Sequence, residues 1–514
     1  MKAFLQTLLL TLTSLELSLA AEKPNILFIA VDDLKPALSC YGDPIAKTPN
    51  FDRLAKRGVT FTNSHCNQAV CGPSRASLMT GLRPDRTKVH DLKTITREVT
   101  PWITTLPQQL KQHGYTTAGT GKIYDPRSVD KKLDAPSWSL PFRLHNLDYN
   151  PKYPEPVLGA YHGAPQRKAF ETMQANGLKG YGPMYAELKK QKLNSVTESE
   201  NVPDDAYTDG AIRKQGIQFM QQLAAKKQPF FLAVGFKKPH LPFIAPKKYW
   251  DMYDPKQLPL ASFQQFAKNA PKFAYHSSPE LRSYAGPPSS GPVPNDQQRH
   301  LIHGYYACVS FIDAQLGLLL DELDRLKLSD NTIVVLWGDH GWHLGDHGLW
   351  CKHTNYEQST RSPLIIAGPG IQKNKQSNAP TEFVDIFPTL CDLTHTPVPN
   401  NLDGVSFLPI LNGSKDAVRE FAMSQFPRGN AMGYALRDSQ FRYIAWPKNT
   451  TDGTPVSDVS NRKGEELYDY ATDPLETKNI AKEETQRARV KAFREKLNKT
   501  LAEQAKRIAL EPKS

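Results

Sequence analysis

Two pairs of adjacent polar residues carry groups that could bind a metal ion. Asp32 and Asp33 stand together directly after an apolar run, and Asp339 with His340 follows a second run. Two carboxylates facing one site repel each other unless a proton or a cation lies between them, and hard divalent ions such as Ca²⁺ prefer oxygen ligands. Alone, the first pair is typical of a turn or a helix cap. With Asp339, it predicts a Ca²⁺ site, in which His340 is either a further ligand or an orienting group.

The segment from Cys71 to Gly81 contains a candidate nucleophile. It reads Cys-Gly-Pro-Ser-Arg followed by Ala-Ser-Leu-Met-Thr-Gly. The proline and serine near its start favour a helix N-terminus, which attracts anions. Arg75 lies one helical turn beyond Cys71, where its guanidinium can make charge-assisted hydrogen bonds. The alternative is a structural cysteine, packed as a small apolar side chain, beside a surface arginine.

Four apolar runs are expected to form the strands that position these groups. They span residues 25–31, 230–236, 332–337 and 363–367. Near-continuous apolar runs are typical of strands buried on both faces, as in a parallel sheet. Polar, chemically capable residues directly follow the first three runs, and ligands of open α/β sheets bind at that edge. We therefore predict an α/β fold with a central, mostly parallel sheet flanked by helices.

The remaining patterns divide the chain into three parts. Apolar residues recur at helical spacing over 306–326, and residues 286–294 and 136–202 are expected to be loops. After about residue 397, short strand-like pieces such as 442–446 precede a charged, periodic segment over 483–506. We predict a signal peptide (1–20), a catalytic domain (21–396) and a smaller C-terminal α+β subdomain with an antiparallel sheet (397–514).

Composition narrows the class of protein. The 514 residues can bury a large core, and no long uncharged apolar run follows the N-terminus, so no membrane span is expected. The first 20 residues resemble a secretory signal, which predicts a secreted or periplasmic protein, or a lysosomal one in a eukaryote.

The six cysteines lack metal-type spacing. The net charge of +12 favours an anionic partner. With scattered basic residues and no recognition motif, a sulfated polyanion fits better than nucleic acid. The alternative is a basic surface that only keeps the protein soluble.

The chain resembles the type I, formylglycine-dependent sulfatases over nearly its whole length after the signal segment, and within them the iduronate 2-sulfatase branch. The resemblance starts with the Cys71–Gly81 segment. The other segments that carry it are residues 31–36 (VDDLKP), 68–75 (QAVCGPSR), 81–85 (GLRPD), 231–243, 339–348, 424–428 (SQFPR) and 432–434 (MGY). Residues 466–469 (ELYD) with Asp473 and Pro474 are more general to sulfatases.

This resemblance implies an alkaline-phosphatase-like fold and a site. It implies that a formylglycine-generating enzyme oxidises Cys71 to formylglycine (3-oxoalanine), which becomes both the nucleophile and a further ligand of one Ca²⁺. Sulfate-ester cleavage also needs positive charge around the sulfuryl oxygens and an acid for the leaving alcohol. The candidates, each in a segment that matches the family, are Lys122, Lys238, His240 and Lys352, with Arg75 beside the nucleophile. The expected substrate-binding residues are Asp125, Trp342 and Arg428.

One position departs from the family pattern. Where iduronate 2-sulfatases carry a histidine three residues after the lysine, this chain has Asp125 after Lys122. An ionised aspartate only accepts hydrogen bonds and would repel sulfate, so Asp125 either pairs with Arg127 or Lys122 or serves as a base. The expected substrate is a sulfated uronic-acid-containing glycosaminoglycan or algal oligosaccharide. The alternatives are a phosphohydrolase of the alkaline-phosphatase-like superfamily and an inactive sulfated-glycan-binding protein.

Overall fold

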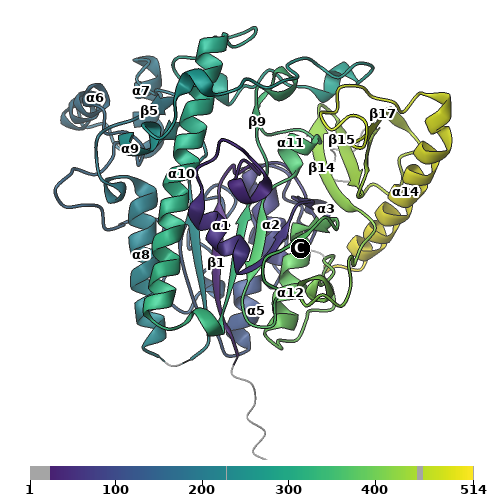
Figure 1. The fold of residues 1–514 in the computed structure, drawn as a ribbon, viewed down its shortest axis with the longest axis horizontal. Helices are drawn as coiled ribbons and strands as arrows, with labels where there is room; N and C mark the ends of the chain where they lie inside the picture. The colour runs from purple at the N-terminus through teal and green to yellow at the C-terminus, as the bar shows by residue number, and fades with distance from the viewer. Residues whose placement is uncertain (1–22, 227, 449–454, 513–514) are drawn as a thin grey trace, which may run out of the picture.

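The computed structural model describes residues 23–226, 228–448 and 455–512 (Figure 1). The segment predicted to be a signal peptide lies outside these residues. Within them, none of the helices combines the length and the apolar composition needed to cross a bilayer.

A seven-stranded sheet forms the centre of the described part of the chain. Its strand order is β12-β2-β11-β8-β1-β6-β4. Four neighbouring strands, β8, β1, β6 and β4, run parallel, whereas β11 is antiparallel to both β8 and β2. The predicted mostly parallel sheet is thus confirmed. The strands are β1 (Asn25–Val31), β2 (Gly58–Phe61), β4 (Thr116–Gly121), β6 (Phe230–Phe236), β8 (Thr332–Gly338), β11 (Leu364–Ala367) and β12 (Lys375–Ser377).

Alternate residues of β1 pack on opposite faces of this sheet, as a period of two requires. Leu27, Ile29 and Val31 belong to the core under α8 (Thr208–Ala224) and α10 (Asn295–Arg325). Ile26 and Phe28 belong to the core under α2 (Cys71–Thr80), α5 (Leu106–Gln112) and α12 (Ile386–Leu393). Both faces are therefore covered by helices, which explains why the strands lack polar alternation.

The C-terminal part forms an antiparallel four-stranded sheet, as predicted, at the right of Figure 1. Its strands are β14 (Ala422–Arg428), β15 (Ala431–Arg437), β16 (Phe441–Pro447) and β17 (Arg462–Asp469), and α14 (Arg487–Ala509) covers one face through Phe493, Leu497 and Leu501. Strand β14 also contacts the segment before α2, because Gln425 N donates to the carbonyl of Asn67 at 2.8 Å. The C-terminal sheet thereby supports the segment that ends at Cys71.

The segment 136–202, expected to be a loop, contains regular structure. Helices α6 (Ala164–Ala175) and α7 (Tyr181–Lys190) and the short strand β5 (Thr197–Glu198) lie within it. Each helix buries only a few apolar residues, including Met173 in α6 and Met184 with Leu188 in α7. Such sparse burial leaves a weak helical period, which explains why the sequence pattern missed both helices.

Short elements complete the described structure. The two-stranded pairs are β3 (Ser64–His65) with β13 (Thr381–Glu382), β5 with β7 (Phe243–Ile244), and β9 (His343–Leu344) with β10 (Trp350–Cys351). The remaining α-helices are α1 (Pro49–Lys56), α3 (Pro84–Thr87), α4 (Thr96–Val99), α9 (Lys247–Trp250), α11 (Glu357–Thr360) and α13 (Leu408–Leu411).

Candidate active site

A charged residue directly follows each of the four parallel strands. In the order of the sheet these residues are Asp339, Asp32, Lys237 and Lys122. Val31 pairs with Gly338 on one side and with Phe236 on the other, so the ends of three of these strands are level. Since parallel strands present their carboxyl ends at one edge, the topology gathers four charges there. Gly235 permits this packing, because a Cβ at that position would lie 2.3 Å from the Lys122 backbone.

Buried cations hold Asp32 in its charged form. Arg75, fully buried in α2, donates from Nη2 to Asp32 Oδ1 at 2.9 Å and from Nε to Asp339 Oδ2 at 3.0 Å. Lys122 Nζ donates to Asp32 Oδ2 at 2.6 Å. Burial by itself would raise the pKa of Asp32, but Lys122 and Arg75 outweigh it and hold this pKa well below its usual range.

Asp33 is less well neutralised. Lys352 Nζ donates to its two carboxylate oxygens at 3.1 and 3.2 Å, and its own amide donates to Asp339 Oδ1 at 2.9 Å. Burial raises the pKa of Asp33 well above its usual range, with a further contribution from Asp32, although Lys352 opposes the shift. The pKa values of the two adjacent aspartates are therefore pushed apart, and the site can accept more positive charge.

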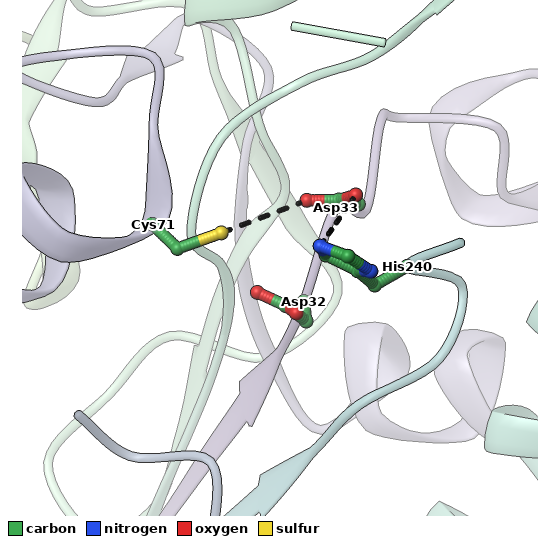
Figure 2. Close-up of side chains that lie close together, drawn as sticks. All are labelled: Asp32, Asp33, Cys71 and His240. Atoms are coloured by element: carbon green, nitrogen blue, oxygen red, sulfur yellow. Dashed lines mark hydrogen bonds and ion pairs between the residues drawn. The ribbon is translucent and has the colours of Figure 1, made fainter. Parts of the chain in front are cut away.

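Cys71 and His340 complete this cluster from two other directions. Cys71 begins α2, and its Sγ lies 3.9 Å from Asp33 Oδ1 and 3.4 Å from His340 Nε2. Figure 2 shows Cys71 pointing toward the two aspartates from the α2 side, with His240 approaching from the other. Burial, followed by the charge of Asp32, raises the pKa of the Cys71 thiol well above its usual range. An unmodified cysteine in this state is a thiol, which is a poor nucleophile.

The donor set fits a divalent cation. His340 Nδ1 lies 2.9 Å from the carbonyl oxygen of Gly341, which can only accept, so Nδ1 carries the proton. In the neutral ring, Nε2 then presents a lone pair 3.3 Å from Asp33 Oδ1 and 3.6 Å from Asp339 Oδ2. Acceptors this close to one another need a proton or a cation between them. Among the residues that the structure describes, two groups of potential ligands have donor atoms within 4.8 Å of one another: Asp32, Asp33, Cys71 and His240, and Cys71, Asp339 and His340.

Glu280 joins two of the predicted catalytic side chains. Its Oε1 accepts from Lys352 Nζ at 2.8 Å and lies 3.3 Å from His240 Nε2. The Lys352 ammonium also lies 4.8 Å from the ring centre of Trp342. Three contacts therefore fix Lys352: Asp33, Glu280 and an aromatic face.

His240 is held in one orientation by its own backbone neighbour. Its Nδ1 lies 2.6 Å from the carbonyl oxygen of Leu241, so Nδ1 is protonated and Nε2 faces Glu280 and Asp33. Burial lowers the pKa of His240 to about 3, and the charges of Lys352 and Lys122 add to the shift. Without a bound anion, the ring is therefore neutral at neutral pH.

A cavity of about 400 Å³ opens beside this cluster. Asp32, Lys122 and His240 line it on the cluster side. Other segments of the chain line it as well, among them Asp125–Arg127, Leu158–Ala160, Tyr181 and Tyr207–Asp209. A cavity of this size accommodates a small saccharide next to the buried carboxylates.

Three sequence candidates lie differently from the others. Lys238 Nζ donates to the carbonyls of His240 and Pro242, at 2.5 and 2.6 Å, so its ammonium stabilises the loop after β6. Trp342 is fully buried and supports Lys352, a position that does not suit contact with a substrate. Arg428, at the end of β14, donates to the backbone carbonyls of Ala274 and His353. Arg428 thus braces the residue next to Lys352.

Asp125 is engaged by both of the partners considered for it. Arg127 donates to its carboxylate from Nε and Nη2, both at 2.9 Å, and Lys122 Nζ lies 3.5 Å away. Burial would raise the pKa of Asp125, but Lys122 and Arg127 hold it well below its usual range. A carboxylate in such a bidentate pair is a weak base, so the geometry favours a positioning role for Asp125.

Sequence analysis missed Glu280 and Lys237. Glu280 follows no apolar run and matches no spacing, and only the folded structure brings it to Lys352. Lys237 did carry a signal, because it is the first residue after a predicted strand, in the position that Asp32 and Asp339 occupy after theirs.

Comparisons with known proteins agree on one family. Residues 24–396 match the Sulfatase family, and residues 345–504 match the C-terminal region of N-sulphoglucosamine sulphohydrolase. The chain is 31% identical to iduronate 2-sulfatase of Homo sapiens, over 89% of this chain and 90% of that protein.

Solved structures share the fold. One is that of a protein in complex with its substrate D-glucosamine-2-N,6-O-disulfate, with a TM-score of 0.71 and 21% identity over 94% of this chain and 98% of that one. Another is the phosphonate monoester hydrolase of Agrobacterium radiobacter, with a TM-score of 0.69 and 24% identity over 94% of this chain and 96% of that one.

Proposed function

Because this chain belongs to the sulfatase family and is a sulfuric ester hydrolase, we propose that it releases sulfate from a sulfated sugar that contains uronic acid, with formylglycine at position 71 and one bound Ca²⁺. The observation that carries this proposal is the convergence of Asp32, Asp33, Asp339 and Cys71 on one strand edge beside two buried lysines. The similarity to an iduronate 2-sulfatase supports the class of sugar.

The proposed metal ligands are Asp32, Asp33, Asp339 and position 71, with His340 as a nitrogen donor. When present, the modified residue and the cation together supply an oxygen nucleophile and a Lewis acid for the sulfuryl group. The rest of the chemistry falls to the protein's own side chains. Arg75 fixes two of the carboxylates, so that their oxygens point to one centre.

Lys122 and Lys352 are proposed to hold the sulfuryl oxygens. Both ammonium groups are buried beside the carboxylate cluster, at 2.6 Å from Asp32 and 3.1 Å from Asp33 respectively. Fixed positive charge in a site shielded from water stabilises negative charge that develops in the transition state. Asp125 and Glu280 each touch one of these lysines and keep it in place.

His240 is proposed to protonate the departing sugar oxygen. It lines the cavity, and its Nδ1 is already bound to a carbonyl, so Nε2 is the atom available for proton transfer. The negative charge of a bound sulfate ester offsets the two lysines and favours the protonated ring. Asp125 and His340 are the candidates for the base that completes turnover. Asp125 is weakened as a base by its bidentate pair with Arg127, and His340 fits the role only when its Nε2 is not bound to the cation.

The test is sulfate release from defined sulfated saccharides by protein co-expressed with a formylglycine-generating enzyme. We expect release from a 2-sulfated uronate disaccharide, an aldehyde or its hydrate at position 71 by peptide mass spectrometry, and no turnover by the Cys71→Ala variant. A phosphate monoester serves as the control substrate. Full activity of protein whose Cys71 is wholly unmodified would overturn the proposed chemistry, and release from phosphate esters alone would overturn the proposed reaction.

A further inference from the structure

Lys237 differs from the other charged residues at the strand edge. Asp339, Asp32 and Lys122 all have side-chain ion pairs with one another or with Arg75. Throughout the described ranges, in contrast, no side-chain hydrogen bond or ion pair involves the Lys237 ammonium. Its backbone amide donates to Asp209 Oδ1 at 2.6 Å, and its backbone carbonyl accepts from the His240 amide at 3.1 Å. Lys237 is thus a partly buried cation that lacks a direct counter-ion.

The carboxylates nearest to Lys237 are already in use. Asp209 accepts from the backbone amides of Lys237 and Lys238, and Asp32 accepts from Lys122 and Arg75. Burial lowers the pKa of Lys237, and Asp209 only partly opposes the shift. An ammonium in this position is stabilised by any anion that enters the cavity.

The cavity supplies the path and a second cation. Lys237 lines the same 400 Å³ space as Arg127, whose side chain is 55% exposed. Arg127 uses Nε and Nη2 on Asp125, which leaves Nη1 for a ligand. Tyr181, 64% exposed, lines the same space and offers an aromatic face to a sugar ring.

We propose that Lys237 and Arg127 form a second anion subsite, which binds a carboxylate or a second sulfate of the same saccharide whose sulfate ester is cleaved. This inference rests on the proposed function for the position of the scissile sulfate. The subsite makes Lys237 a specificity-determining residue: it selects sugars that carry a negative group in addition to the ester under attack.

Calorimetric titration of the Cys71→Ala variant, in which turnover is blocked, tests the subsite directly. The ligands are a 2-sulfated uronate disaccharide, its carboxylate methyl ester, glucosamine 2-N,6-O-disulfate and glucosamine 6-O-sulfate. Added to that background, Lys237→Gln is expected to raise the Kd of the free acid, the disulfate or both by about ten- to a hundredfold, as the loss of a hydrogen bond to a charged group does. The Kd should rise much less for the two ligands that carry a single anionic group, the methyl ester and the 6-O-sulfate.

Two further variants keep the test decisive. Lys237→Arg keeps the positive charge and should retain the preference for the doubly charged ligands. Lys247→Gln removes the charge of an exposed lysine paired with Asp251 and should leave every Kd unchanged. A loss confined to the free acid assigns the subsite to a carboxylate, and a loss confined to the disulfate assigns it to a sulfate.

Equal weakening of all ligands by Lys237→Gln, or no weakening, would overturn the inference. Its failure is distinguishable from failure of the proposed function, which is measured as sulfate release by the unsubstituted enzyme. If the enzyme released no sulfate but still preferred the doubly charged ligands, the subsite would be supported and the proposed function would be contradicted.

Discussion

Two regions of this molecule hold buried carboxylates in contrasting surroundings. At the edge of the central sheet, Asp32, Asp33 and Asp339 crowd against one another, against Cys71 and against the acceptor nitrogen of His340. In the C-terminal sheet, Glu466 stands alone among neutral donors: its Oε2 accepts from Tyr356 at 2.9 Å and Tyr468 at 2.6 Å, and its Oε1 from Trp446 at 2.8 Å.

The difference separates a structural carboxyl group from functional ones. Both carboxylate oxygens of Glu466 accept hydrogen bonds from fixed donors. The Glu466 side chain therefore links Tyr356 to β16 and β17, and it requires no bound ion to satisfy it. The oxygens of the three aspartates at the sheet edge accept from Arg75, Lys122, Lys352 and one backbone amide, yet the carboxylates still face one another, a cysteine and an acceptor nitrogen, an arrangement that a bound cation would stabilise. Burial alone therefore does not identify a site, whereas several carboxylates that face one another indicate one.

Exchange of one charge in each region should give the largest contrast. Asp339→Asn keeps the shape but removes a charge that holds Arg75 and that would bind the proposed cation, so kcat/KM for sulfate release should fall by about 10²- to 10⁴-fold. Glu466→Gln, the matched control, should keep the rate within about twofold. Similar losses in both variants, with both proteins folded by circular dichroism, would show that the two regions do not differ as described.

Glu280→Gln tests whether Glu280 belongs to the functional region. Glu280 bridges Lys352 and His240, and loss of such a supporting group typically costs about ten- to a hundredfold. The expected loss is in kcat, with a displaced pH profile, because the neutral amide no longer balances the charge on either partner. Glu171→Gln, at an exposed position of α6, serves as the control. A Glu280→Gln pH profile that overlays that of the wild type would show that Glu280 does not act on Lys352 and His240 during turnover.

Glu466→Ala probes the structural region. It leaves three buried donors without an acceptor, so the free energy of unfolding should fall by about 2–4 kcal/mol. Urea denaturation measures this loss, and Glu503→Ala on the exposed face of α14 is the control. If Glu466→Ala left stability unchanged while abolishing activity, Glu466 would be a functional residue and not a structural one.

The pH dependence of stability gives the smallest expected effect. Burial raises the pKa of Glu466 to about 7, above its value in the unfolded chain, although three donors oppose the shift. The stabilisation from the protonated folded form is therefore present at low pH and is lost as the pH rises through 7. Between pH 6 and 8, the unfolding free energy should fall by about 1–1.5 kcal/mol more in the wild type than in Glu466→Gln. Equal slopes for the two proteins would contradict the assignment.

The sequence predicted most of the sheet edge and little of its surroundings. Strand ends are visible as apolar runs that stop at a charge, so the amino-acid pattern alone was enough to place Asp32, Asp33 and Asp339 together. The same rule pointed to Lys237, but the family pattern drew attention to its neighbour Lys238, whose ammonium caps backbone carbonyls. Glu280 and the buried position of Trp342 depend on loops that meet only after folding, and no local pattern encodes such contacts.

Metal content tests the central claim most directly. Protein purified without chelator and dialysed against metal-free buffer should retain about one divalent cation per chain, which we expect to be Ca²⁺, by elemental analysis. Asp339→Asn should lose that cation and keep its fold, whereas Glu466→Gln should keep both. A wild-type protein that contains no metal after exhaustive chelation and still releases sulfate at its full rate would contradict the claim that the carboxylates at the sheet edge are a cation site.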